Sequence, residues 1–148
     1  MTISVSVNTG PLLDISARIE AAARMGWPTN EINARLLAKV RRGFRNSTDP
    51  YGQKWAPIQP RWRNKKRAPG QPLLDTGRLR NSIRGATTTN TMRIFTDVEY
   101  AQYHQLGQRV RKRAILPDER GLPPEWDAEI TKSIRARLKS VLEGFTND

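Results

Sequence analysis

The chain of 148 residues contains no cysteine and only one histidine, His104. Without cysteine it can form no disulfide, no thiolate zinc site and no cysteine nucleophile. A single histidine also excludes metal sites that need several imidazole ligands. No stretch approaches the roughly 20 consecutive apolar residues of a membrane-spanning helix, and the first residues lack the basic start and apolar run of a secretory signal. We therefore expect a soluble cytosolic protein, with one domain over residues 1–148.

Acidic residues are few, with 14 Asp and Glu against 26 Lys and Arg, which gives a formal net charge of +12. The acids are scattered and form no spacing typical of a calcium or magnesium site. No glycine-rich segment has the lysine and spacing of a phosphate-binding loop. We therefore expect no metal, no cofactor, no small-molecule substrate and no membrane partner. The excess positive charge predicts a negative partner, either nucleic acid or an acidic protein surface.

His104 is the one side chain that titrates near neutral pH, so a hydrolase built on this chain would need it as a base. Asp97 or Glu99 would then orient the imidazole, and Ser82 would be the nucleophile. The position of His104 inside a short Tyr-His-Gln segment favours instead a packed or interface histidine. We predict that the protein is not an enzyme and has no catalytic residue.

The pattern of apolar residues predicts an α+β fold, with a small antiparallel sheet of three to four strands flanked by helices. Alternation of apolar and polar residues predicts a strand at 3–7. Two β-rich segments at 85–89 and 92–96 are separated by Asn90 and Thr91, which predicts a hairpin.

Apolar residues at helical spacing predict helices over residues 12–25, 29–45, 76–83, 100–106 and 124–142. Thr29 is expected to cap the second of these helices, and Asp75 or Thr76 the third. Gly107 is expected to end the fourth in a left-handed conformation.

Two basic stretches are expected to lie outside regular structure. Residues 46–72 contain five prolines, which exclude a continuous helix or a central strand. The arm at 107–118 is expected to be extended or a strand. Such segments either neutralise phosphates, with Trp62 stacking on a base, or dock on an acidic protein, and composition leaves both readings open. The cations of the two stretches are Arg61, Arg63, Lys65, Lys66 and Arg67 in the loop and Arg109, Arg111, Lys112 and Arg113 in the arm.

Four segments, in order, resemble signatures of the phage virion morphogenesis family, which includes the tail-completion proteins of Mu-like and P2-like phages. DPYGQKWAPI at 49–58 resembles D-P-x-G-x-x-W-x-P-L, and LLDTGRLRNSI at 73–83 resembles L-x-D-T-G-x-L-x-x-S-I. YAQYHQLG at 100–107 resembles Y-A-x-x-H-Q-x-G. RAILP at 113–117 resembles the R-x-F-L that follows, with Ile115 in place of an aromatic residue. The similarity runs from about residue 32 to residue 117.

The resemblance implies a structural virion assembly protein that acts in tail completion, as a tail terminator at the head-proximal end of the tail. It would work as a homo-oligomeric ring, for which a hexamer matches six-fold tail symmetry. Its partners would be other copies of itself, a tail tube or sheath protein and the head-side connector protein, with DNA passing through the lumen without specific binding. It would reside in the tail or neck of the virion, and in the host cytoplasm during assembly. The alternative is a DNA-binding module that uses residues 61–67 and 109–113.

The signature residues divide into two expected roles. Trp55 should pin the long loop to the body, and His104 and Gln105 should hydrogen-bond a neighbouring loop. Residues expected to serve the fold are Asp75, Thr76, Gly77, Leu79, Ser82, Tyr100, Ala101 and Gly107. Residues expected to contact other subunits or the connector are Trp55, Arg61, Trp62, Arg63, Lys65, Lys66, Arg67, His104, Gln105, Arg109, Arg111, Lys112 and Arg113.

Overall fold

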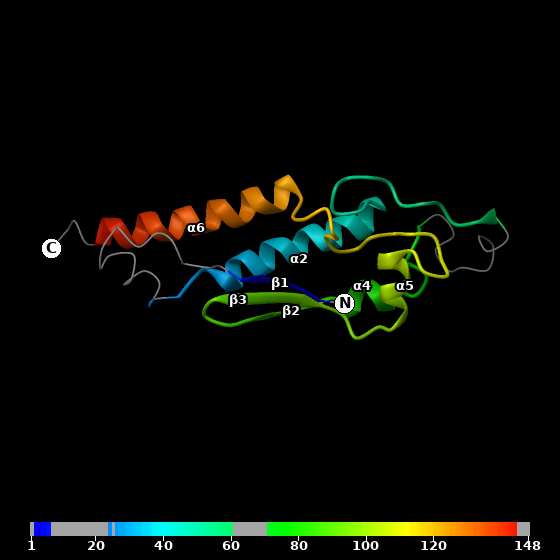
Figure 1. Ribbon diagram of the computed structural model, residues 1–148, viewed down its shortest axis with the longest axis horizontal. Helices are drawn as coiled ribbons and strands as arrows, with labels where there is room; N and C mark the ends of the chain where they lie inside the picture. Colours follow the sequence, from blue (N-terminus) through cyan, green and yellow to red (C-terminus); the bar gives the residue numbers. More distant parts are fainter. Residues whose placement is uncertain (1, 7–23, 25, 61–70, 145–148) are drawn as a thin grey trace.

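The computed structural model describes residues 2–6, 24, 26–60 and 71–144. Within them a small antiparallel sheet lies against helices, which confirms the predicted α+β class (Figure 1). The helix predicted over residues 12–25 lies, apart from Arg24, outside the described residues. The elements are β1 (Thr2–Ser6), α2 (Thr29–Asn46), α4 (Arg78–Ser82), β2 (Arg84–Thr87), β3 (Thr91–Phe95), α5 (Tyr100–Leu106) and α6 (Pro124–Gly144).

The sheet is built around β3, which pairs antiparallel with both β1 and β2 in the order β1-β3-β2. The predicted hairpin is β2 and β3, and each strand begins one residue earlier than the sequence indicates. Met92 and Ile94 of β3 are buried while Arg93 between them is exposed. This alternation gives the sheet one face toward the core and one toward solvent.

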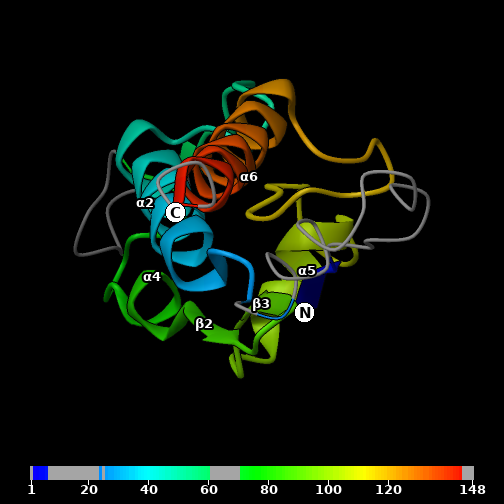
Figure 2. The same cartoon turned by 90° about the vertical axis from the view of Figure 1, so that its left-hand side faces the viewer.

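The buried face of the sheet is covered by α2, and α6 packs on the side of α2 away from the sheet (Figure 1). The view along the long axis also shows α2 between α6 and the strands (Figure 2). Its core residues Ile32, Leu36, Val40 and Phe44 recur every four positions and form one stripe. The central helix therefore holds the sheet and α6 in one hydrophobic core.

Thr29 does not cap α2 but is its first residue, and Pro28 occupies the cap position. The Thr29 hydroxyl donates to the carbonyl of Thr88 at 2.7 Å, and the Trp27 N–H donates to the carbonyl of Thr89 at 3.1 Å. Both bonds reach the turn of the hairpin. The hydroxyl therefore joins α2 to the sheet rather than satisfying the helix's own N–H groups.

The cap of the short helix α4 lies one residue after Thr76 and two after Asp75, the two caps that the sequence predicts. Gly77 holds the cap position with a φ of 74°, and no side chain caps the helix. The Thr76 hydroxyl accepts a hydrogen bond from the Arg78 N–H at 3.3 Å, next to the cap. The glycine is required because residues with a Cβ rarely adopt this φ.

The last two predicted helices are confirmed. α5 begins and ends at the predicted residues, and Gly107 follows it with a φ of 74° while its N–H donates to the carbonyl of Tyr103 at 2.9 Å. α6 begins at Pro124 and buries Trp126 and Ile130 against the core.

Gly85 of β2 lies directly beneath α2, where an added Cβ would overlap the side-chain amide of Asn33. We predict that Gly85→Ala lowers the free energy of unfolding by about 1–3 kcal/mol, the usual cost of overpacking. The same substitution in an Asn33→Ala background should cost less, because the overlapping amide is gone. Urea denaturation of the four proteins measures the difference. An equal loss in both backgrounds would show that Asn33 does not constrain this position.

Candidate functional site

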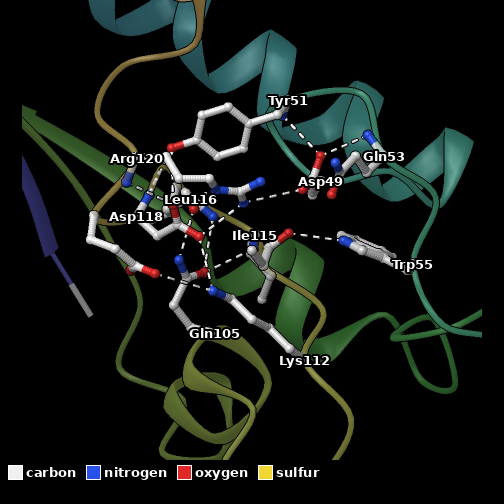
Figure 3. Close-up of polar contacts among 12 residues, drawn as sticks. Asp49, Tyr51, Gln53, Trp55, Gln105, Lys112, Ile115, Leu116, Asp118 and Arg120 are labelled. Carbon is white, nitrogen blue, oxygen red and sulfur yellow. Dashed lines mark hydrogen bonds and ion pairs between the residues drawn. The ribbon is translucent and has the colours of Figure 1, made fainter.

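Gln105 of α5 joins this helix to the arm (Figure 3). Its side chain is 6% exposed. Its Oε1 accepts hydrogen bonds from the N–H groups of Ile115 at 2.8 Å and Leu116 at 3.1 Å, and its Nε2 donates to the carbonyl of Leu116 at 2.7 Å. These are the contacts to a neighbouring loop that the sequence predicts. The amide is thus buried and engaged within the chain, where it joins α5 to the arm, and the interface role of Gln105 stays a prediction.

Trp55 is also internal, with 6% of its surface exposed. Its ring meets Phe44 of α2 edge to face at a centroid distance of 5.4 Å. Its indole N–H donates to the carbonyl of Ala114 at 2.8 Å. Trp55 therefore joins its own segment to α2 and at the same time holds the arm, and its interface role stays a prediction.

The start of the predicted loop 46–72 is an ordered turn. The Asp49 carboxylate accepts from the backbone N–H groups of Tyr51 at 2.9 Å and Gln53 at 2.8 Å (Figure 3). Gly52 has a φ of 86° within this turn. An aspartate that bonds the backbone two residues ahead is a standard turn former, so the D-P-x-G signature specifies local structure. Trp62 and the basic residues around it lie outside the described residues; the basic residues are Arg61, Arg63, Lys65, Lys66 and Arg67.

Arg120 links this turn to the segment that follows the arm. Its guanidinium donates to both carboxylate oxygens of Asp118, at 2.8 and 2.9 Å. It also reaches the Asp49 carboxylate at 3.3 Å and lies 3.7 Å from the centre of the Tyr51 ring. These contacts, with Lys112 at 3.0 Å from Asp118, hold the pKa of Asp118 well below its usual value, chiefly through Arg120.

Sequence reasoning missed this cluster of Asp49, Tyr51, Asp118 and Arg120. Opposite charges two residues apart after a proline were its only local signal. The remaining partners are separated from them by about seventy positions in the chain, so no local pattern joins them.

The arm at 107–118 forms no strand, and its two halves differ. Residues 107–112 are exposed, whereas residues 114–117 are buried. Leu116 is 0% exposed and belongs to the main hydrophobic core. Only the first half of the arm is therefore available for the intersubunit contacts predicted for the whole.

The four cations of the arm differ in how they are compensated. Lys112 pairs with the carboxylates of Asp118 and Glu119, at 3.0 and 3.7 Å. The guanidinium of Arg109 lies 5.3 Å from the Tyr103 ring centre, and Arg111 is exposed. Among the described residues, neither arginine forms an ion pair.

Arg113 is half-buried and has no carboxylate partner in the described part of the chain. Its Nε donates to the carbonyl of Ala56 at 2.7 Å and its Nη2 to that of Pro57 at 3.1 Å. The pKa of Arg113 is lowered, first by burial and then by the neighbouring charge of Arg111. The side chain thus holds residues 56–57 against the arm, while no carboxylate among the described residues compensates its charge.

A cavity of about 640 Å³ opens between α4, α5, the arm and the segment before α4. The structure thereby brings together two signatures that are well separated in the sequence. His104 lies in its wall, with its ring edge-on to Tyr100 at a centroid distance of 6.4 Å. The lining includes the predicted residues Asp75, Thr76, Gly77, Leu79, Tyr100, His104, Arg109, Arg111 and Arg113, together with Ile58, Gln59, Pro72, Leu73, Arg78 and Val110.

Two of the side chains considered for a hydrolase, Ser82 and Asp97, form other contacts. The Ser82 hydroxyl donates to the carbonyl of Leu79 at 2.7 Å and lies 2.6 Å from the Thr96 hydroxyl. Asp97 forms an ion pair with Arg84. Ser82 therefore serves the fold by joining α4 to the end of β3.

The described residues contain no group of three or more potential ligand side chains that could hold a metal ion. None of the helices built from them is long and apolar enough to span a membrane.

We expect the hydrogen bonds of the Gln105 amide to stabilise the fold. Gln105→Leu should lower the free energy of unfolding by about 1–3 kcal/mol, because it leaves buried N–H and carbonyl groups of residues 115–116 without a partner. Gln102→Leu, on the exposed side of the same helix, is the matched control and should change little. Thermal and urea unfolding measure both. Similar effects of the two substitutions would mean that the amide does not hold the arm.

The carboxylate of Asp118 generates a pH prediction. Because its pKa is depressed in the folded state below the ordinary 3.8, it stabilises the fold above that value and loses this effect as the pH falls through the folded pKa. The free energy of unfolding should therefore decrease below about pH 4, and Asp118→Asn should flatten the decrease. Urea midpoints at a series of acidic pH values measure this, with the exposed Asp127→Asn as control. Parallel curves for wild type and Asp118→Asn would refute it.

A comparison with known protein families finds one family whose model spans all four signature segments. Residues 11–139 match the model of the phage virion morphogenesis family. No curated protein and no solved structure matches the chain. The family match covers the Asp49 turn, the α4 cap, α5 and the arm described above. The chain therefore belongs to the phage virion morphogenesis family.

Proposed function

We propose that this protein completes the head-proximal end of a phage tail as a homo-oligomeric ring. Its family supports a structural role in the assembly of the bacteriophage virion. Our proposal adds three points to that structural role: the protein forms a ring, it lies at the neck, and it acts as the tail terminator. The mechanism is steric and adhesive, because each subunit covers a surface of the next and the closed ring ends growth of the tail tube.

The observation that carries the proposal is an exposed apolar surface on α5 and the first half of the arm. Tyr100, Leu106 and Val110 are 39%, 58% and 39% exposed. We call these three residues the α5–arm surface. They are three of the five large hydrophobic side chains that the described part of the chain leaves exposed. Tyr100 and Val110 line the same cavity, and Leu106 is the last residue of α5, directly before the arm. Exposed apolar side chains that lie together are typical of protein interfaces, so we propose a neighbouring subunit as their cover.

The sheet offers a second contact. β1 and β2 are its edges, and no other described strand pairs with their outer sides. Unpaired strand edges readily accept a strand from another chain. Edge pairing between subunits would add directional hydrogen bonds to the non-directional burial of the α5–arm surface.

We further propose six subunits per ring, a tail tube or sheath protein on one side and the head-side connector on the other. DNA would pass through the lumen without specific contacts. The alternative of a DNA-binding module has less support at residues 109–113. Lys112 is already paired with carboxylates and Arg113 is half-buried against backbone carbonyls, which leaves Arg109 and Arg111 to face a phosphate.

Self-association tests the proposed surface. The double variant Leu106→Asp, Val110→Asp should be monomeric under conditions in which the wild type forms a closed oligomer, because charges would be buried at the contact. Light scattering after size exclusion measures the mass. Leu142→Asp, at a residue of α6 that is 41% exposed, is the control and should still assemble. Equal loss of assembly in both variants would remove the α5–arm surface from the interface.

The assignment to tail completion needs a separate test. Purified wild-type protein, added to tail tubes assembled without it, should bind one end of each tube and stop its elongation. Negative-stain imaging shows both effects, and the monomeric double variant should produce neither. A wild-type protein that joins no tube ends would overturn the proposed function.

A further inference from the structure

The cavity beside α5 has the size of a binding site for a small group. Its volume of about 640 Å³ falls within the range of about 300–1,000 Å³ that ligand sites occupy. Part of its wall is aliphatic, from Ile58, Leu73, Leu79 and Val110. Leu79 is buried and anchors α4 in the core, so this part of the wall is firmly held.

The charged part of the wall is strongly unbalanced. The described residues that line the cavity include four arginines, Arg78, Arg109, Arg111 and Arg113, and a single carboxylate, Asp75. None of the four arginines forms an ion pair with another described residue. Like charges that converge on one cavity repel each other, and an anion that enters it relieves this repulsion.

The half-buried Arg113 contributes to this excess of positive charge in the cavity wall. Its two hydrogen-bond acceptors, the carbonyls of Ala56 and Pro57, carry no formal charge and do not neutralise it. Burial and Arg111 both disfavour its charged form. An incoming carboxylate would oppose both effects and would be held by a charge-assisted hydrogen bond.

We propose that this cavity binds an acidic peptide segment of a neighbouring protein, with one apolar side chain inside the cavity and flanking carboxylates on its arginines. The identification of that neighbour as another virion component rests on the proposed function, whereas the binding chemistry does not. A peptide fits better than duplex DNA, because a duplex keeps its bases stacked inside and presents a phosphodiester backbone, which has no apolar side chain to place against the aliphatic wall.

The test uses an array of synthetic heptapeptides with Leu, Ile, Phe or Trp at the centre and Asp or Glu on either side. A matched array carries Asn and Gln in place of the acids. Fluorescence anisotropy with the full-length protein should show binding of the acidic peptides at least about tenfold tighter than of their amide counterparts, and the affinity should fall with added salt.

The variants locate the binding. Arg78→Glu with Arg111→Glu, both at exposed positions, should weaken the acidic peptides at least about tenfold. Arg135→Glu on α6, which does not line this cavity, is the matched control and should bind as the wild type does. Circular dichroism of all variants checks that they remain folded. Acidic and amide peptides of equal affinity, or equal binding by the two kinds of variant, would overturn the inference.

Two further outcomes separate this inference from its alternatives. Binding of short duplex DNA that the Arg78 and Arg111 substitutions abolish, without peptide binding, would overturn it in favour of nucleic acid. A wild-type protein that forms rings and stops tube growth but binds no peptide would overturn this inference alone. A protein that binds acidic peptides yet remains monomeric would support the cavity while contradicting the ring.

Discussion

The structure depends on a segment without regular secondary structure that lies in the core. Residues 114–117 are buried, so their backbone N–H and carbonyl groups need partners other than water. Gln105 supplies three of these and the Trp55 indole a fourth. Two side chains thereby supply hydrogen bonds that a neighbouring strand would supply in a sheet. They also fix the turn after α2, the arm and α5 relative to one another, which sets the shape of the cavity.

The charge distribution follows from the same arrangement. On the helical side of the body, Arg35 and Lys39 of α2 pair with Glu129 and Glu125 of α6, at 2.9 and 3.3 Å. Beside the arm, Asp118 draws in Arg120 and Lys112. Since these three acids are engaged at these places, they do not neutralise the arginines of the cavity wall. In the sequence the net positive charge suggests a nucleic-acid partner. In the structure, part of that charge lies on the arginines of one cavity.

The sequence predicts the structure correctly where neighbouring residues determine it. Period and turn residues predicted α6, the β2–β3 hairpin and the stop of α5 at Gly107. It was insufficient where a residue's partner is distant. Thr29 has the residue type of a cap, but its hydroxyl bonds the hairpin instead, and nothing near it in the chain indicates this. The internal contacts of Trp55 and Gln105 are hidden in the sequence for the same reason, because the segment that covers them lies elsewhere in the chain. The cavity combines residues 72–79 with 100–113, and no local pattern could reveal it.

The strand order has a consequence for biosynthesis. β1 contains the first described residues, but its partner is β3, so Thr2 pairs with Phe95. The ribosome therefore completes β1 long before a partner exists, and at about 5–20 residues per second the strand waits for roughly 5–20 s. The β2–β3 hairpin, by contrast, forms from neighbouring residues. Although β1 is synthesised first, it joins the sheet only after the β2–β3 hairpin has formed. Until then its backbone N–H and carbonyl groups have no partner strand.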